Sequence, residues 1–226
     1  MTFDVIILTY SIDEKHAQIT RDTLKSLKNA EMDIKLKPLV IESGNDYDFG
    51  VETIRFDEKF NYNKALNLGL SKTKNKYALL CNNDLVYEKG FAERLYAGFK
   101  LGFMSLSPYC KIYNKNRTEI GDYIFQSYQV GVSIAGWCIA IDRAILSTIG
   151  KLNEEVDFWY SDNIYGEQIK RYDIKHGLVC NSFVEHLGSM TLNELKRKDF
   201  VKLTTKQKAK YQKAIAGIYE DKKHNT

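Results

Sequence analysis

The stretch YALLCNND, residues 77–84, decides the fold, because an apolar run typical of a β-strand stops abruptly at two amides and one carboxylate. A continuous apolar run indicates a strand buried on both faces, as in a parallel sheet covered by helices. Asn82, Asn83 and Asp84 therefore follow directly after a buried strand. In open α/β sheets ligands bind beyond the carboxyl ends of the strands, so this triplet predicts a binding site.

The segments around this strand predict the order strand–helix–strand–strand–helix–strand. The expected strands are residues 4–10, 34–43, 51–56 and 76–84; one helix follows a cap at Ser11 or Asp13, and the other covers residues 61–73. Ala65 and Gly69 give the second helix a small-residue face for close packing on the sheet. This alternation predicts an α/β fold with a mostly parallel sheet and right-handed crossovers.

The second half of the chain is less regular. We expect a strand near residues 101–108, a strand and a short helix within 133–150, a helix over 161–177, and a last strand from residue 178 that leads into His186. The start of the helix, Ser161-Asp162-Asn163, has N-cap chemistry, and His176-Gly177 is expected to end it.

Composition is that of a globular chain with one sizeable domain: 44% of its 226 residues are hydrophobic and 27% are charged. No apolar run is long enough to cross a bilayer. The opening MTFDVIILTY has no basic leader and predicts a first strand, not a secretion signal, so we expect a cytoplasmic protein. The four cysteines show no CxxC pairing, which favours reduced, buried thiols.

The net charge of +4 is unevenly distributed. From Leu195 onward the chain carries ten basic and three acidic residues, so this segment is +7 and the remainder is −3. We expect residues 1–194 to form the domain and residues 195–226 to form a basic helical tail. Such a tail predicts contact with an anionic partner, either nucleic acid or a membrane surface; the alternative is a solvated helix face.

Four stretches, in order, carry a resemblance to a known family. They are VIILTYS; FNYNKALNLGL followed by KYALLCNNDL; GWCIAIDRAILSTIGKLNEEVDFWYSDNIY; and VEHLGSMT. Together they cover residues 2–191, and the chain resembles the family-two-like glycosyltransferases with the GT-A fold. The resemblance implies a Rossmann-like α/β domain that transfers a sugar from a nucleoside-diphosphate donor with a divalent metal.

The resemblance also implies roles at matching positions. The metal ligands would be Asp84 and His186, the general base Asp162, and the acceptor-side aromatics Trp137 and Trp159. The positions expected to bind the nucleotide sugar are Thr9, Tyr10, Ser11, Glu42, Asn45, Asn67, Asn82, Asn83 and Asp84. Asn82 stands where the family often has the first acid of Asp-x-Asp, which leaves the metal with fewer anionic ligands.

These residue types suit the implied chemistry. A divalent cation stabilises a departing diphosphate as a Lewis acid, and oxygen ligands favour Mg²⁺ or Mn²⁺, while an imidazole favours Mn²⁺. A carboxylate that takes the proton of an acceptor hydroxyl during attack opposite the leaving group gives inversion. Each residue also has a plainer reading from local sequence: Asp162 as an N-cap, Asp84 as a turn residue, His186 as a surface histidine, and Trp137 as a core aromatic.

Other functions stay open at this point. A nucleotidyltransferase usually has a glycine-rich phosphate loop after the first strand, and ILTYSIDEKH has no glycine. A non-catalytic nucleotide-sugar-binding module is a second alternative. A phage-type enzyme that glycosylates hydroxymethylated DNA bases is a third, suggested by the basic tail. We expect a UDP-sugar donor rather than a GDP- or TDP-sugar, and an acceptor that is a glycan, a lipid-linked sugar, a protein or modified DNA.

Overall fold

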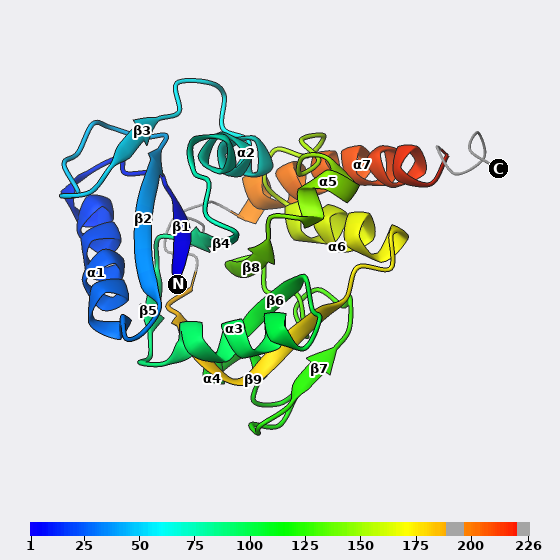
Figure 1. Ribbon diagram of the computed structural model, residues 1–226. Helices are drawn as coiled ribbons and strands as arrows, with labels where there is room; N and C mark the ends of the chain where they lie inside the picture. The colour runs from blue at the N-terminus through cyan, green and yellow to red at the C-terminus, as the bar shows by residue number, and fades with distance from the viewer. Residues whose placement is uncertain (189–196, 221–226) are drawn as a thin grey trace.

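The computed structural model describes residues 1–188 and 197–220 and shows a central sheet with helices on both faces (Figure 1). The elements in chain order are β1 (Thr2–Thr9), α1 (Glu14–Ala30), β2 (Lys35–Glu42), β3 (Thr53–Arg55), α2 (Tyr62–Lys72), β4 (Tyr77–Asn82), β5 (Leu85–Tyr87), α3 (Phe91–Lys100), β6 (Ser105–Tyr109), α4 (Lys111–Asn114), β7 (Ile124–Gln126), β8 (Cys138–Asp142), α5 (Ile145–Ile149), α6 (Ser161–Arg171), β9 (His176–His186) and α7 (Arg197–Glu220).

Within the described residues the sheet has nine strands in the order β3-β2-β1-β4-β8-β6-β9-β5, with β7 also paired to β9. The half formed by β3, β2, β1 and β4 is parallel, as the sequence predicts. In the other half β8 runs antiparallel to β4 and β6, while β6 and β9 are parallel. The result is a mixed α/β sheet whose parallel half ends at the predicted polar clusters.

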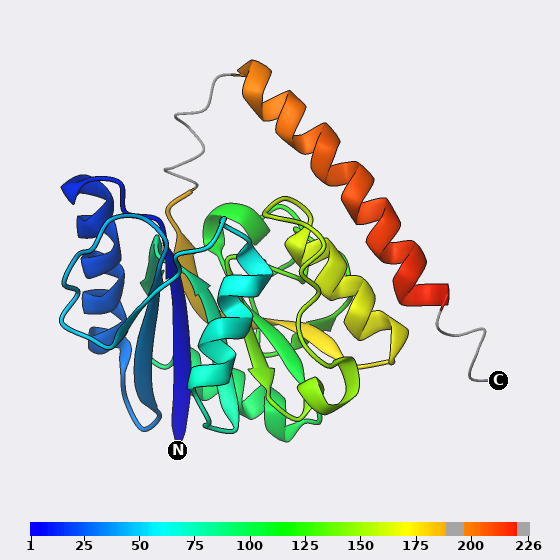
Figure 2. The same ribbon diagram turned by 90° about the horizontal axis from the view of Figure 1, so that it is seen from above.

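The apolar run of β1 is continuous because both of its faces are covered. Phe3, Val5 and Ile7 belong to one core cluster with residues of α1 and α3, whereas Ile6 and Leu8 belong to a second cluster with residues of α2 and α6. Figure 2 shows α1 and α2 on opposite sides of the strands. Successive side chains of a strand point to opposite faces, so a strand between two helical layers needs apolar residues at every position.

Helix α2 approaches the sheet closely through its small residues. A Cβ atom at Gly69 would overlap the side chain of Ile6, so a larger residue there would push the helix away from β1. The helix begins at Asn61, whose side chain accepts a hydrogen bond of 3.0 Å from the Lys64 amide. Asp13 caps α1 in the same way, accepting from the His16 amide at 3.0 Å. Asp13, and not Ser11, is therefore the cap of α1.

The predicted start of α6 at Ser161 is confirmed, but its predicted cap and its predicted end are wrong. The residue before the helix is Tyr160, which has φ 70° and no side-chain cap bond, so Asp162 lies inside the first turn and is not the N-cap. The helix ends at Arg171, and His176 and Gly177 instead open β9. Asp173, with φ 52°, turns the chain between these two elements.

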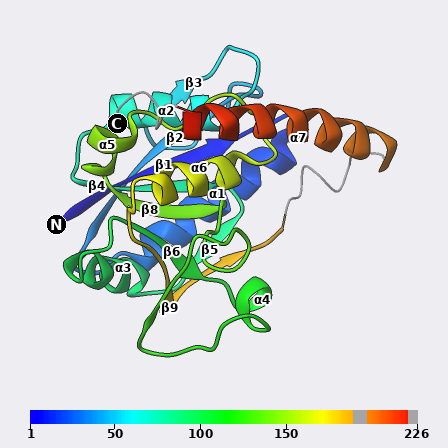
Figure 3. The same cartoon turned by 90° about the vertical axis from the view of Figure 1, so that its right-hand side faces the viewer.

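Helix α7 lies alongside α6, as Figure 3 shows. Tyr211 stacks on Tyr160 with ring centroids 4.9 Å apart, and Ala214 is buried in one cluster with Val156 and Ile164. The predicted basic tail is thus helical over its described part and packs on the domain. The predicted boundary at residue 194, the tail positions 195, 196 and 221–226, and the last three residues of VEHLGSMT lie outside the described residues.

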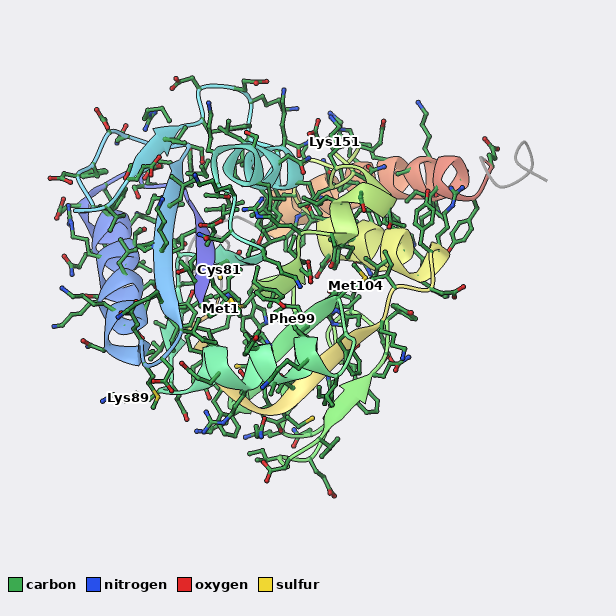
Figure 4. All side chains as sticks on the ribbon, in the orientation of Figure 1. Met1, Cys81, Lys89, Phe99, Met104 and Lys151 are labelled. Atoms are coloured by element: carbon green, nitrogen blue, oxygen red, sulfur yellow. The ribbon has the colours of Figure 1, made fainter. Side chains whose placement is uncertain are left out.

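The four cysteines are free and buried, as predicted. Cys81 lies in the middle of the molecule, while Lys89 and Lys151 lie at its rim (Figure 4). The Cys81 and Cys138 sulfur atoms are 3.7 Å apart across the β4–β8 pair. None of the helices that the structure describes is long and apolar enough to cross a membrane.

Candidate functional site

A cavity of about 410 Å³ lies at the carboxyl ends of β1 and β4. This is the edge of the sheet at which α/β proteins bind ligands. The residues that line it are Leu8, Thr9, Tyr10, His16, Ile19, Ser43, Glu58, Phe60, Tyr62, Asn82, Asn83, Asp84 and Phe158. Five of the predicted nucleotide-binding positions, Thr9, Tyr10, Asn82, Asn83 and Asp84, are therefore brought together.

Asn83 joins the ends of β1 and β4 and fixes this wall of the cavity. Its amide nitrogen donates to the hydroxyl oxygens of Thr9 at 3.0 Å and Thr20 at 2.9 Å. The backbone carbonyl of Asn83 accepts a hydrogen bond of 2.5 Å from the Thr23 hydroxyl. The oxygen of that hydroxyl in turn accepts a hydrogen bond of 3.0 Å from the backbone amide of Leu85. The Asn83 amide nitrogen is thus engaged by threonines of β1 and α1.

Asn82 is held by Tyr62, the first residue of α2. The Tyr62 hydroxyl donates to Asn82 Oδ1 at 2.8 Å and also lies 2.9 Å from the carbonyl oxygen of Gly136. Burial raises the pKa of Tyr62 well above its usual value, so the hydroxyl keeps its proton and stays a donor. Tyr62 therefore ties the end of β4 to the chain that enters β8.

Asp84 and His186 form the chemically most unusual pair at this edge. Asp84 Oδ1 lies 3.2 Å from His186 Nε2, and both side chains are buried. The pairing of β5 with β9 places Leu85 opposite His186, and the Leu187 amide donates to the Asp84 carbonyl at 3.0 Å. The contact lacks hydrogen-bond geometry, and within residues 1–188 and 197–220 Asp84 Oδ1 and both ring nitrogens of His186 find no hydrogen-bond partner.

This donor set fits a divalent cation. Buried polar atoms normally find a partner, and a carboxylate oxygen that faces an imidazole nitrogen without a hydrogen bond is an arrangement that a shared cation satisfies. Among the described residues no group of three or more His, Cys, Asp or Glu side chains could hold a metal ion. Asp84 and His186 would therefore be only part of a coordination shell that a ligand must complete.

A second cavity, of about 160 Å³, adjoins the first and shares Tyr62, Asn82 and Phe158 with it. Its other lining residues are Gly136, Trp137, Trp159, Tyr160, Ser161, Asp162 and His186. The predicted base, both predicted acceptor-side tryptophans and the predicted histidine ligand thus line one space. Asp84 lines the first cavity and His186 the second, so the pair stands between the two.

Asp162 is packed closely against Gly136 in this second cavity. A Cβ atom at position 136 would lie 2.8 Å from Asp162 Oδ2, so only glycine leaves room for the carboxylate. Burial raises the pKa of Asp162 above its ordinary value, although Oδ1 accepts a hydrogen bond of 2.9 Å from the Asn163 amide. A carboxylate with a raised pKa is a better proton acceptor than a solvated one.

Four predicted nucleotide-binding residues lie outside both cavity linings. Glu42 is fully buried and accepts from the amides of Ser11 at 3.0 Å and Gly44 at 2.5 Å, so it holds two loops together. The Asn45 side chain donates to the Ile12 carbonyl at 2.7 Å. Asn67 donates to the Leu152 carbonyl at 2.8 Å and accepts from its amide at 3.0 Å, tying α2 to the loop before α6.

Several lining residues were not predicted from the sequence. His16 is buried, and its Nδ1 lies 2.6 Å from Asp13 Oδ1. The centroid of the Phe158 ring lies 6.1 Å from that of Phe60 and 6.0 Å from that of Tyr62. Phe158 and Tyr62 line both cavities, and Phe60 lines the larger one. The signal for Phe60 and Tyr62 is their place in the FNYN stretch just before α2, whereas nothing local marks His16 or Phe158.

Comparison with solved structures shows the same fold. A mannosyltransferase from Pyrobaculum calidifontis, solved with GDP-Man and Mn²⁺, matches with a TM-score of 0.66 at 13% identity over 95% of this chain and 64% of its own. TarS from S. aureus, solved with UDP-GlcNAc, gives 0.62 at 13% identity over 93% and 66%. GalNAc-T7, solved with UDP, GalNAc and Mn²⁺, gives 0.64 at 13% identity over 82% and 44%.

The chain therefore spans between 44% and 66% of the length of these solved chains. No curated protein matches it significantly. The model of the family described as glycosyl transferase family 2 matches residues 4–124, which contain β1 to β4, the cavity wall formed by Asn82 and Asn83, and Asp84. This match covers more than half of the chain and agrees with the GT-A fold of the solved structures. The chain belongs to glycosyl transferase family 2.

Proposed function

We propose that this chain is a metal-dependent, inverting glycosyltransferase. The larger cavity would take a nucleoside-diphosphate sugar, and the smaller one would take the acceptor hydroxyl. The observation that carries the proposal is the position of the Asp84–His186 pair between the two cavities, with 3.2 Å between Oδ1 and Nε2 and no hydrogen bond to satisfy either atom. That boundary is where a diphosphate leaving group and an acceptor would meet.

Asp84 and His186 are the residues that would hold the cation. When bound, a divalent metal supplies a Lewis acid that stabilises the negative charge of a departing diphosphate. One carboxylate oxygen and one imidazole nitrogen suit Mn²⁺ or Mg²⁺, with the imidazole favouring Mn²⁺. Because the chain offers so few ligands, metal affinity should rise when a nucleoside diphosphate supplies the remaining oxygens.

Asp162 is the proposed general base. It lines the smaller cavity, and packing against Gly136 limits its solvation and fixes its direction. Its carboxylate would accept the proton of the acceptor hydroxyl as that oxygen attacks, which typically contributes about 10²–10⁴ in rate. In this proposal Asp162 acts only as a base and the acceptor oxygen displaces the diphosphate directly, so the anomeric carbon inverts.

We propose a UDP-sugar donor ahead of GDP- and TDP-sugars. TarS was solved with UDP-GlcNAc and GalNAc-T7 with UDP, while the mannosyltransferase was solved with GDP-Man. Thr9, Tyr10 and Ser43 line the larger cavity at the ends of β1 and β2 and would contact the nucleoside. Ser11, Glu42 and Asn45 would act on this region indirectly, through the loop that they hold.

The acceptor is proposed only as a hydroxyl beside Trp137 and Trp159. Helix α7 also exposes Lys206, Lys208 and Lys213, which supports an anionic partner such as nucleic acid or a membrane surface. Binding to short duplex DNA and to vesicles containing anionic lipid, each measured across a salt series, separates these partners. If neither the DNA nor the vesicles bind at low salt, where charge attraction is strongest, the anionic partner is removed from the proposal.

A donor panel tests the proposed function. Thermal shift with UDP-, GDP- and TDP-sugars plus Mn²⁺ identifies binding, and release of the nucleoside diphosphate measures turnover. We expect one donor to raise the melting temperature more in the presence of Mn²⁺ than in its absence, and Asp84→Ala to abolish this difference. Asp22→Ala, on an exposed part of α1, is the matched control. Binding without turnover for every donor and acceptor would support the binding-module alternative, and absence of any metal-dependent shift would contradict the proposal.

A further inference from the structure

The imidazole of His186 has no hydrogen bond that sets its orientation. Nδ1 and Nε2 are both buried, and neither has a hydrogen-bond partner in the part of the chain that the structure describes. A histidine that binds a metal through one nitrogen usually donates its other N–H to a carboxylate or a carbonyl, and this outer contact fixes the ring. In this chain the ring must be oriented by something else.

Packing against two aromatic side chains orients the His186 ring instead. The Trp137 indole stacks on the His186 ring, with centroids 5.5 Å apart and planes 12° apart. The Tyr113 ring lies 5.4 Å from the same imidazole, tilted by 34°. Stacking of this kind is attractive beyond the area that it buries, and it restricts the plane of the smaller ring.

Trp137 is itself well anchored. Its carbonyl accepts from the Asn82 amide at 2.9 Å, and its neighbour Cys138 pairs with Cys81 in the β4–β8 ladder. The indole also packs against the core cluster that contains Leu85, whose register partner on β9 is His186. The platform under the imidazole is therefore tied to β4, the strand that delivers Asp84.

We infer that Trp137 is a positioning residue, which holds the His186 ring with Nε2 facing Asp84 and thereby sets the affinity of the site for a divalent cation. The inference rests on the proposed function, because it assumes that Asp84 and His186 bind a metal. It assigns the indole a task different from stacking on an acceptor sugar. An acceptor platform would affect acceptor binding alone, whereas a ring support affects metal binding when no acceptor is present.

Calorimetric titration of Mn²⁺ into protein saturated with UDP, without donor sugar or acceptor, tests the inference. We expect Trp137→Leu to weaken Mn²⁺ about 10- to 100-fold, as removal of outer-shell partners does, and Trp137→Phe to keep most of the affinity because a phenyl ring still stacks. Trp159→Leu, which removes the other tryptophan of the same cavity, should leave the Mn²⁺ affinity at the wild-type value. Circular dichroism and melting curves verify that each variant is folded.

A double-mutant cycle with His186→Ala makes the result specific. If Trp137 acts through His186, then Trp137→Leu causes no further loss of Mn²⁺ affinity in the His186→Ala background. An equal loss in both backgrounds, or wild-type affinity in Trp137→Leu, would overturn the inference and leave the proposed function intact. Absence of Mn²⁺ binding by the wild-type protein with UDP would contradict the proposed function, and this inference with it.

Discussion

Asp84 Oδ1 lies 3.2 Å from His186 Nε2, although the two residues belong to different halves of the chain. Their meeting depends on β5, a strand of only three residues, which pairs antiparallel with the end of β9. The same pairing leaves the two side chains buried at the edge where β1 and β4 end. The proposed cation site therefore depends on the pairing of β5 with β9, which brings Asp84 and His186 together.

Replacing the proposed base should slow the reaction without weakening the donor. Asp162→Asn keeps the shape of the side chain but cannot accept the acceptor proton, so we expect kcat to fall by about 10²–10⁴ while the donor affinity is kept. Asp22→Asn, a change at an exposed carboxylate of α1, is the matched control. Retention of wild-type kcat by Asp162→Asn would show that another group takes the proton.

The activity should also depend on pH through Asp162. Burial raises the pKa of this carboxyl, so its protonated form persists to a higher pH than that of a solvated aspartate. The base must be ionised, and kcat should therefore fall as the pH drops through a pKa above the ordinary value of 3.8. A profile of kcat against pH, measured with saturating donor and metal, shows this fall of kcat on the acidic side. If the fall disappears in Asp162→Asn, the carboxyl of Asp162 is the group that titrates.

Gly136 should be intolerant of any side chain. A methyl group there would lie 2.8 Å from Asp162 Oδ2 and 2.9 Å from Asp162 Cβ, so the base must shift as a whole. We expect Gly136→Ala to lower kcat by about 10²-fold, the typical cost of a displacement of about 1 Å in a catalytic group. Gly217→Ala on α7 is the matched control and should leave kcat unchanged, because among the described residues no atom from outside its own helical turn lies within 4 Å of the added methyl.

Helix α7 should stabilise the loop that carries Phe158 and Trp159. The Gln207 side chain accepts from the Asp157 amide at 2.8 Å and donates to Asp157 Oδ2 at 3.0 Å, and the Asp157 carbonyl accepts from the Tyr62 amide at 2.7 Å. Gln207 is buried, so Gln207→Leu leaves the Asp157 amide without this partner and should lower the free energy of unfolding by about 1–3 kcal/mol. Urea denaturation measures the change, and Lys208→Ala, an exposed position of α7, should have almost no effect.

Stability should fall in mild acid because of His176. Burial lowers the pKa of this histidine to about 4, and the ring lies between the Ser105 hydroxyl at 2.7 Å and the Ser133 carbonyl at 3.0 Å. The carbonyl can only accept, so Nε2 carries the hydrogen and Nδ1 accepts from Ser105. Below the unfolded pKa of about 6.5 the unfolded chain binds a proton that the folded chain excludes, so stability decreases as the pH falls from about 6.5 to about 4.

The expected size of this effect is about 2 kcal/mol between pH 7 and pH 5. Urea denaturation of the wild type at these two pH values gives the total change. His176→Gln has no titrating ring, and the difference between the two slopes isolates the contribution of the histidine. Equal slopes for the two proteins would contradict the account of this buried network.

The parallel half of the sheet could be predicted because its signals are local. The central strands β1 and β4 are apolar runs that end in polar residues, and each helix of this half has a recognisable cap, Asp13 or Asn61. Helix α3, which the elements expected from the sequence do not include, carries the same kind of local signal, because Phe91, Leu95 and Phe99 recur every four residues and are buried. Strands as short as β5 and β7 carry too few residues to show a pattern.

The site was predictable in part, and for a physical reason. Residues at strand ends, such as Thr9, Asn82, Asn83 and Asp84, meet because parallel strands end at one edge. Glu42 and Asn67 have the right chemistry, but they form hydrogen bonds within loops that local sequence cannot place. Asp162 looks like a cap because Ser161-Asp162-Asn163 has N-cap chemistry, whereas the positive φ of the residue that does precede the helix, Tyr160, leaves no mark in the sequence.

The most direct test of the central claim is calorimetric titration of UDP into the protein with and without Mn²⁺, for the wild type, Asp84→Ala and His186→Ala. If these two residues hold the cation, Mn²⁺ strengthens UDP binding to the wild type. This gain in affinity is lost in Asp84→Ala and strongly reduced in His186→Ala. The affinity for UDP without metal is the same in all three proteins. A wild-type gain from Mn²⁺ that persists in Asp84→Ala would contradict the account.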